Sequence, residues 1–320
     1  MIALLFLFMN SQSSVRLKVN EPLTPHFMKG RFRSICPDGS FLLLEEVMAL
    51  HFNADGRLIN KLGQKGEGPG EFNFILTGIF DGNYYWFKDA DPIITLYSKA
   101  GKFLIELPIR GGIQKIGYSG KSLYMFHLTP KPRPSPYLGL VEINGFEQVE
   151  TLNSLTHFHP TSQEIIKFKY NNDNHWLIFH GGRLYVADEM TPKVQVYDLD
   201  YNYLREIKLL LPEYAPSPNT WVSYRGTTRL QRLEWFASWS RFVGFAVKES
   251  GMLIAYDVPV EDNPQITQTA VVQVDFDGKP MKRVIKYDAD FMGTHGGFYY
   301  LFRIKDENVI PEYWVDAVPW

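Results

Sequence analysis

Short runs of hydrophobic residues recur along the chain, and each run follows a turn that contains a glycine. In six places the glycine is followed by five or six mostly apolar residues, a length that suits a strand buried on both faces. These turn glycines are Gly39, Gly82, Gly120, Gly182, Gly251 and Gly297. Glycine at this position supplies the positive φ that a tight hairpin turn needs. The pattern therefore predicts six β-hairpins.

A second hairpin follows the first in most of these copies, with Asp-Gly, Ala-Gly or Asn-Gly at several of its turns. Two hairpins give about four strands, and the copies recur at a spacing of roughly 40 residues. Four strands in a repeat of this length are typical of a β-propeller blade. We therefore predict an all-β fold, a six-bladed β-propeller.

The N-terminal segment completes the predicted ring. The sixth copy has no second hairpin before Trp320, so the last blade lacks an outer strand. Residues 15–19 alternate between apolar and basic side chains, and we expect this N-terminal strand to close the last blade and remove its open edge. Two gaps between copies are long, which predicts insertions near residues 153–176 and 212–242 in a single domain of residues 14–320.

The first residues of the chain are apolar. Residues 2–9 form a run that is too short to span a bilayer, and the small residues Ser11 and Ser13 follow it. This order fits a signal segment in residues 1–13, although the usual basic residues before the apolar run are absent. We therefore expect no transmembrane span, and a location in the periplasm or outside the cell.

Charge and cysteine content narrow the classes of function. The 33 Lys and Arg residues nearly balance the 35 Asp and Glu residues. The net charge of -2 gives no electrostatic argument for binding nucleic acid or an anionic membrane. Cys36 is the single cysteine, so no internal disulfide can form, and we expect a small buried residue rather than a nucleophile.

The most distinctive local motif is the glycine-rich loop LGQKGEGPGEF of residues 62–72. Its glycines permit backbone shapes that are closed to other residues. Successive amide groups in such a loop can bind an anion, with Lys65 beside them. The alternative is a shaped connection between two blades, in which Glu71 bonds nearby backbone groups.

Two stretches carry a resemblance to known proteins. GRLYVADEMTPKVQVYDLD, residues 182–200, resembles an NHL-type blade. The GxKGxGPGEF loop, residues 63–72, is similar to a loop of a family of exported bacterial six-bladed β-propeller proteins. The resemblance implies the fold and frequent export. It places no catalytic residues on this sequence, because most members of the family have no established activity.

The second predicted insertion combines aromatic and basic residues. Residues 227–241 show a fair helical pattern, which contains Arg229, Arg232, Trp235 and Trp239. Aromatic planes beside arginines suit sugars, peptides or anionic ligands, so we predict a ligand site at these four residues. The alternative is that the tryptophans pack the insertion onto the ring.

Acidic residues recur six or seven positions after the turn glycines. In a propeller these positions rim the mouth of the central channel, where ligands commonly bind. One interpretation is a calcium or zinc site held by several blades, with a histidine as a base. Its candidate ligands are Glu45, Asp89, Asp188 and Asp257, and the candidate base is His127. The other interpretation is that each acid bonds the backbone of its own turn.

Two functional hypotheses follow from these patterns. The leading one is a non-enzymatic propeller outside the cytoplasm that binds a small molecule, a glycan, a peptide or a protein partner, with no cofactor. The alternative is a metal-dependent enzyme of the lactonase or lyase type, with its site at the channel mouth. The sequence contains no P-loop, dinucleotide fingerprint, cysteine-based zinc motif or Gly-x-Ser-x-Gly, which favours the binding hypothesis.

Overall fold

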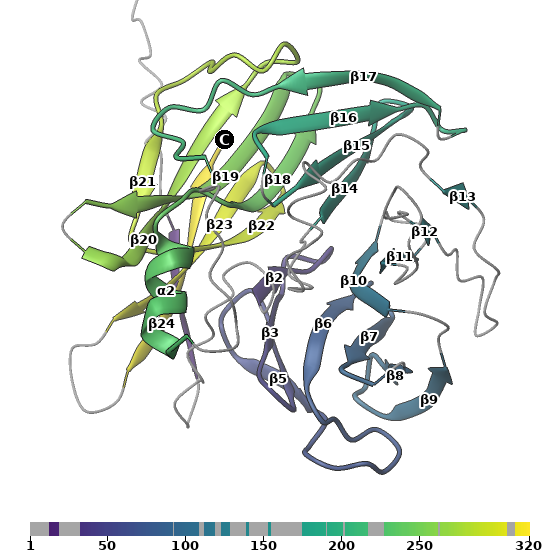
Figure 1. The fold of residues 1–320 in the computed structure, drawn as a ribbon. Coiled ribbons are helices and arrows are strands. Elements are labelled where there is room, and N and C mark those ends of the chain that lie inside the picture. The colour runs from purple at the N-terminus through teal and green to yellow at the C-terminus, as the bar shows by residue number, and fades with distance from the viewer. Residues whose placement is uncertain are drawn as a thin grey trace, which may run out of the picture.

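Most of the chain is described by the computed structural model (Figure 1). The described residues are 13–18, 33–91, 93–108, 112–118, 123–128, 139–140, 153–154, 175–189, 191–200, 202–216, 227–261, 263–305 and 311–320. They form β-strands with one helix, α2 (Arg229–Ala237), so the predicted all-β class is confirmed.

Residues 33–108 form two four-stranded sheets in which consecutive strands pair antiparallel. The strands of the first blade are β2 (Arg33–Ile35), β3 (Phe41–Leu44), β4 (Ala49–Phe52) and β5 (Leu58–Leu62). The strands of the second blade are β6 (Ile75–Phe80), β7 (Tyr84–Asp89), β8 (Ile93–Ser98) and β9 (Phe103–Pro108).

The C-terminal half of the chain contributes three more four-stranded sheets of the same kind. The first contains β14 (His175–His180), β15 (Arg183–Asp188), β16 (Lys193–Tyr197) and β17 (Tyr203–Lys208). The next contains β18 (Phe242–Lys248), β19 (Gly251–Val260), β20 (Asn263–Val274) and β21 (Ile285–Tyr287). The last contains β22 (Asp290–His295), β23 (Phe298–Lys305), β24 (Glu312–Pro319) and β1 (Ser13–Leu17).

The described chain therefore has five four-stranded blades, and the predicted number of six is wrong. The third sequence copy yields a two-stranded sheet of β10 (Gly112–Tyr118) and β11 (Leu123–Leu128), and a separate pair of β12 (Gly139–Leu140) and β13 (Asn153–Ser154). Prolines at alternate positions from 130 to 136 lie between these pairs in the sequence, and proline cannot donate a ladder hydrogen bond. The β10–β11 sheet lies between β6 and β14 in the ring.

The N-terminal strand closes the last blade, as the alternation of residues 15–19 predicted. β1 pairs antiparallel with β24, from Ser13 opposite Ala317 to Leu17 opposite Tyr313. The innermost strand of that blade, β22, in turn contacts β2 of the first blade. The two ends of the chain are thereby joined, and the outer edge of β24 is covered.

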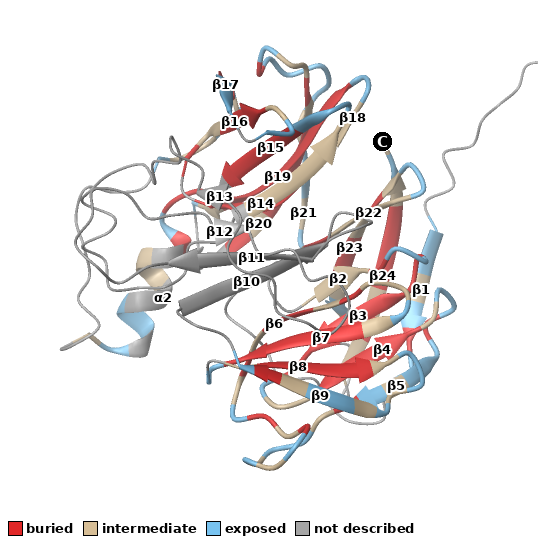
Figure 2. Ribbon diagram, turned by 90° about the vertical axis from the view of Figure 1, so that its right-hand side faces the viewer, coloured by how far each residue is buried: buried red, intermediate tan, exposed pale blue. Residues whose placement is uncertain are grey.

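The hydrophobic core lies between neighbouring blades (Figure 2). All four residues of β3 and of β4 are buried, as expected for strands covered on both faces. One cluster joins Leu42 and Leu44 of the first blade to Tyr85 and Phe87 of the second. Similar clusters join the blades on either side of β18–β21, so each blade is held mainly by its neighbours.

Five of the six turn glycines lie in the described residues, and all five adopt the positive φ that their pattern predicted. The φ of Gly39 is 81° and that of Gly251 is 139°. A Cβ at Gly251 would lie 2.4 Å from the carbonyl oxygen of Val274, so a side chain there would collide with β20. The predicted helical pattern is also present, because α2 begins after the cap residue Thr228 and lies against β19 and β20.

Closure by β1 should contribute directly to stability. Leu17 is 3% exposed and packs with Phe302, Tyr313 and Val315. We expect Leu17→Ala to lower the free energy of unfolding by about 2–5 kcal/mol, measured by urea denaturation. The control is Arg16→Ala on the solvent side of the same strand, whose exposed ion pair with Glu312 should contribute about 1 kcal/mol or less. Equal losses from both variants would contradict the closing role of β1.

Candidate functional site

The predicted rim residues lie at one edge of the blades, where second strands end and innermost strands begin. Asp89 of β7 faces Ile75 of β6, and Glu45 directly follows β3. Glu45, Asp89 and Asp257 are all buried. Asp188 ends β15 and His127 lies on β11, but their side chains are outside the described part of the structure. Among the described side chains, no three of these residues gather at metal-binding distance.

Asp89 bonds the connection between the first two blades. Its carboxylate accepts hydrogen bonds from the backbone N–H of Asn73 at 2.9 Å and of Phe74 at 2.8 Å. Lys88 beside it donates to the carbonyl oxygens of Asp89 and Asp91. Burial lowers the pKa of Lys88 to about 8, opposed by the nearby carboxylates of Asp89 and Asp91. These contacts give Asp89 a structural role of the kind the backbone-bonding interpretation describes.

Asp257 is bonded by an arginine. Its carboxylate, which is fully buried, accepts a hydrogen bond from Arg241 at 3.0 Å. The Arg241 guanidinium also lies 3.7 Å from Glu189, which follows β15, so it links two neighbouring blades. Arg33 and Asp290 form a similar ion pair between the first blade and the last. The candidate metal role of the rim carboxylates stays a prediction.

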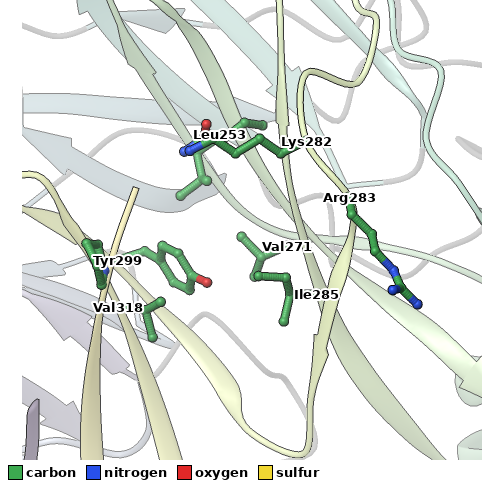
Figure 3. Close-up of a pocket in the computed structure, with 9 residues that line it drawn as sticks. Leu253, Val271, Lys282, Arg283, Ile285, Tyr299 and Val318 are labelled. Atoms are coloured by element: carbon green, nitrogen blue, oxygen red, sulfur yellow. The ribbon is translucent and has the colours of Figure 1, made fainter. Parts of the chain in front are cut away.

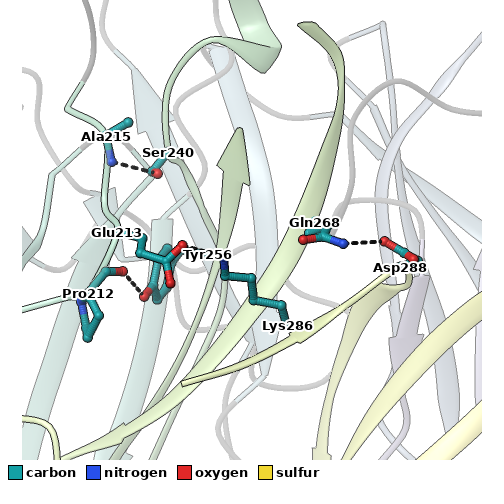
Figure 4. A network of polar contacts seen from close by, with 8 residues as sticks. All are labelled: Pro212, Glu213, Ala215, Ser240, Tyr256, Gln268, Lys286 and Asp288. Carbon is teal, nitrogen blue, oxygen red and sulfur yellow. Dashed lines mark hydrogen bonds and ion pairs between the residues drawn. The ribbon is translucent and has the colours of Figure 1, made fainter. Parts of the chain in front are cut away.

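The second insertion is attached to the blade β18–β21 by polar contacts (Figure 4). The Tyr256 hydroxyl donates to the carbonyl oxygen of Pro212 at 2.6 Å. Ala215 and Ser240 exchange two hydrogen bonds, one through the Ser240 hydroxyl at 2.9 Å and one through its backbone N–H at 2.7 Å. Lys286 of β21 pairs with Glu213. The start of the insertion is therefore tied to the ring, and the Ala215–Ser240 pair joins its start to its end.

The tryptophans of the insertion pack against each other. The rings of Trp235 and Trp239 meet edge to face with their centres 5.5 Å apart. Trp239 is 2% exposed, whereas Trp235 is half-buried, so Trp239 does not present its ring to solvent. Arg229 and Arg232 lie on α2, but their side chains are outside the described structure. A ligand at these four residues stays a prediction.

The glycine-rich loop is organised by its own Glu71. The carboxylate accepts from the backbone N–H of Gly68 at 2.8 Å and from the Gln64 amide at 2.6 Å. The Gly68 N–H, then Gln64, hold the pKa of Glu71 below its usual value. A Cβ at Gly66 would lie 1.8 Å from this carboxylate. Glu71 thus bonds nearby backbone, as the alternative interpretation of this loop held, and Lys65 remains exposed to solvent.

A pocket of about 280 Å³ opens between the last two blades (Figure 3). Leu253, Val271 and Val318 give it apolar walls, and the hydroxyl of Tyr299 points toward Val271 and Ile285. Lys282 and Arg283 belong to the segment before β21 and line the same pocket. The pocket therefore has apolar walls that also include Gln273 and the Tyr299 hydroxyl, and two cations lie at its edge.

A third cation lies close to this edge. Lys248 donates to the carbonyl oxygen of Trp320 at 2.8 Å, and its ammonium group lies 4.0 Å from the centre of the Trp320 ring. Burial, then the charge of Lys282, lowers the pKa of Lys248. The sequence did not predict this pocket. Its one signal in the sequence was the pair Lys282-Arg283 beside apolar residues.

A second polar cluster lies at the opposite edge of the first blade. The Ser40 hydroxyl donates to Asp38 and lies 2.6 Å from Nε2 of His51, while Nδ1 of His51 lies 2.6 Å from the Tyr85 hydroxyl. Asn60 donates to the same hydroxyl at 2.7 Å. For a neutral imidazole one arrangement satisfies every bond: Tyr85 donates to Nδ1, and Nε2–H donates to Ser40. In this arrangement each of the three successive hydrogen bonds, from Tyr85 through His51 and Ser40, donates toward Asp38.

This cluster contains further groups with shifted pKa values. Burial lowers the pKa of His51, opposed by the charge of Asp38 and assisted by that of Lys99. Burial raises the pKa of the Cys36 thiol to about 12. Cys36 is 3% exposed, so it is the small buried residue that the sequence predicted.

Comparisons with solved structures place the chain among β-propellers at low sequence identity. A candidate exported protein of Bacteroides fragilis is 12% identical, with a TM-score of 0.60 over 97% of this chain and 95% of that one. A DUF4221 family member from Bacteroides vulgatus is 9% identical, with a TM-score of 0.64 over 95% and 96%. A chain of a mitotic checkpoint complex is 9% identical, with a TM-score of 0.50 over 92% and 75%.

These comparisons show the fold and leave the NHL-type likeness without further support. No protein-family profile matches the sequence. No curated protein matches it either. In the described part of the chain, no helix has the length and apolar character that a membrane span requires.

The role of Asp89 can be tested by stability with and without a chelator. We expect Asp89→Ala to lower the free energy of unfolding by about 1.5–3 kcal/mol, because two amides of the loop lose a charged acceptor. Asp91→Ala, which removes one exposed contact to Asn73, should cost less. Thermal melts should show the same Asp89→Ala difference with and without EDTA. A chelator effect confined to the wild type would instead make Asp89 a metal ligand.

The buried His51 should make stability depend on pH. Its pKa in the folded state lies below its ordinary value of 6.5, so the unfolded chain takes up the proton first as pH falls. The free energy of unfolding therefore has its full value above pH 6.5, and it decreases as pH falls from there through the folded-state pKa of His51. We expect the free energy of unfolding, measured in urea between pH 7.5 and about 5, to fall more in the wild type than in His51→Gln. Parallel pH profiles would contradict this assignment.

Proposed function

We propose that the chain is a non-enzymatic ligand-binding β-propeller that works outside the cytoplasm. The fold that it shares with a candidate exported Bacteroides protein supports the location. The alternative, a metal-dependent lactonase or lyase, would use carboxylates such as Asp89 and Asp257. Backbone amides bond the first of these carboxylates and Arg241 bonds the second, which favours a structural role for both.

The pocket between the last two blades carries this proposal. Its volume of about 280 Å³ lies at the lower end of ligand sites in proteins, which suits a small molecule or one or two side chains of a peptide. Its walls come from β19, β20, β23 and β24, so rigid strands rather than a loop shape most of it. A site built on such strands binds with little reorganisation.

The chemistry of the pocket selects the class of ligand. Leu253, Val271 and Val318 would cover an apolar or aromatic group, and burial of that group supplies most of the affinity. Lys282 and Arg283 would bind a negative group at the edge. Because both cations are exposed, salt should weaken their contribution. The ligand is therefore a molecule or peptide segment with an apolar body and an anionic end.

A protein partner can present the same chemistry. The structural neighbours include a chain of the mitotic checkpoint complex, which shows that this fold serves in protein assemblies. An acidic peptide segment that carries one apolar side chain would meet both requirements of the pocket. The peptide and the free small molecule are two sources of one ligand chemistry.

Anilinonaphthalene sulfonate, which has an aromatic body and an anionic end, is a direct probe of the pocket. We expect one equivalent to bind, with a rise in fluorescence that weakens as salt is added. The double variant Lys282→Gln/Arg283→Gln should weaken binding several-fold. Ile285→Trp, at a half-exposed wall residue, should fill the pocket and abolish binding without changing the melting temperature.

The control is Lys208→Gln/Lys279→Gln, which makes the same change in net charge at exposed positions outside the pocket. Its affinity for the probe should match the wild type. Equal affinities for the wild type, the pocket charge variant and Ile285→Trp would reject the pocket as the ligand site. A benzoate and an acidic peptide with one phenylalanine can then be compared as competitors of the probe.

A further inference from the structure

Three different metal-ligating side chains meet at the hairpin turn of the first blade. One ligand atom each from Cys36, Asp38 and His51 lies within 4.8 Å of the others, and no other such group is found among the described residues. Cys36 and Asp38 belong to the turn between β2 and β3, and His51 lies on β4 opposite Leu42. A turn and a paired strand hold the three groups in a fixed relation.

We propose that Cys36, Asp38 and His51 bind a zinc ion, with the Ser40 hydroxyl or a water molecule as the fourth ligand. Sulfur, imidazole nitrogen and carboxylate oxygen are the donors that Zn²⁺ takes in proteins, usually four of them in a tetrahedron. A thiolate and a carboxylate together carry two negative charges, which match the charge of the ion. This site is separate from the predicted rim ligands and from the pocket.

The Ser40 hydroxyl lies among the three candidate ligands. It bonds Asp38 and lies 2.6 Å from Nε2 of His51, and the thiol of Cys36 also bonds to Ser40. One hydroxyl therefore already connects all three candidate ligands. A metal ion placed among them would replace these hydrogen bonds by direct coordination.

The surroundings of His51 fit a metal-bound histidine. Metal-binding histidines commonly use their second ring nitrogen to bond a neighbouring group that orients the ring. Nδ1 of His51 lies 2.6 Å from the Tyr85 hydroxyl, which Asn60 holds in place. Coordination by Nε2 requires that the proton move to Nδ1, so that Nδ1–H donates to Tyr85. The proposal thus predicts a change of tautomer on metal binding.

The ion would enter from the side of Asp38. This residue is exposed at the turn, whereas Cys36 and His51 are 3% and 2% exposed behind it. Coordination must remove the thiol proton, and burial holds the pKa of this thiol at about 12 without an ion. The affinity should therefore rise with pH, and each bound ion should release a proton.

Calorimetry with Zn²⁺ and absorption spectroscopy with Co²⁺ test the site on the full chain without an affinity tag. We expect one equivalent of Zn²⁺ to bind and to raise the melting temperature, with reversal by chelator. Co²⁺ should give a thiolate-to-metal charge-transfer band and the visible bands of a tetrahedral ion. The ¹⁵N resonances of His51 should shift to the Nδ1–H tautomer on addition of Zn²⁺.

Variants separate the ligands from their support. Cys36→Ser should abolish the charge-transfer band, and His51→Gln should abolish stoichiometric binding. Asp38→Asn should weaken Zn²⁺ binding by roughly tenfold or more, because even the loss of a group that only orients a metal ligand has an effect of this size. Asp38 is exposed, so this change leaves the core intact. Tyr85→Phe should weaken binding by about 10–100-fold through loss of the bond that orients His51.

The matched control is His180→Gln, a histidine on β14 outside the cluster, which should bind Zn²⁺ as the wild type does. Asp277→Asn serves in the same way for the carboxylate. Absence of Zn²⁺ binding by the folded wild type, or unchanged binding by both Cys36→Ser and Asp38→Asn, would overturn the proposal. The cluster would then be a hydrogen-bonded chain that fixes the first turn.

Discussion

Apolar contact between the faces of neighbouring sheets holds this ring together. The strands in the middle of the blades are buried on both sides, so no blade can cover its own core. Hydrophobic contact has little directional preference, and by itself it would allow sheets to slide over each other. Ion pairs and hydrogen bonds at the edges of the blades fix how neighbouring sheets are placed against each other. Two ion pairs each fix one blade against its neighbour. They are Arg33–Asp290 and Arg241–Glu189.

The same reasoning explains the acids at this edge. Strand ends leave backbone groups without ladder partners, and a buried group of this kind must find another partner. Asp89 accepts hydrogen bonds from two amides of the segment that connects the first blade to the second. Glu71 accepts one from an amide of the glycine-rich loop in the same connection. Asp257 and Glu189 instead pair with Arg241, so the acids at this edge bond either backbone amides or an arginine.

Much of the fold could be predicted because its signals are local. A turn glycine followed by an apolar run specifies a hairpin within ten residues or so, and the period of about 40 residues then implies a blade. The pairing of β1 with β24 was predicted from the missing outer strand of the last copy. The blade count failed at the third copy, where the described residues form the β10–β11 hairpin but no four-stranded sheet. A local hairpin signal does not report whether the next two strands join the same sheet.

The sites were less predictable because they depend on distant residues. The pocket arises where β19 and β20 of one blade meet β23 and β24 of the next, and no sequence motif spans that contact. Cys36 and His51 approach each other through hairpin pairing, but Tyr85, which holds the imidazole, comes from the next blade. The tryptophans of the insertion were visible in sequence, but their burial depends on how the insertion packs on β19 and β20.

Joining the last blade through β1 has a consequence for biosynthesis. The Ser14 hydroxyl donates to Asp316 across 302 positions of the sequence, so this bond can form only when nearly the whole chain has left the ribosome. Until then β1 has no strand to pair with, while blades made early can already pack on each other. Contacts between such distant segments form slowly, and an unpaired strand can add to the sheet of another molecule. The final step of folding is therefore the one at which two copies of this chain would most readily exchange β1 and become a domain-swapped pair.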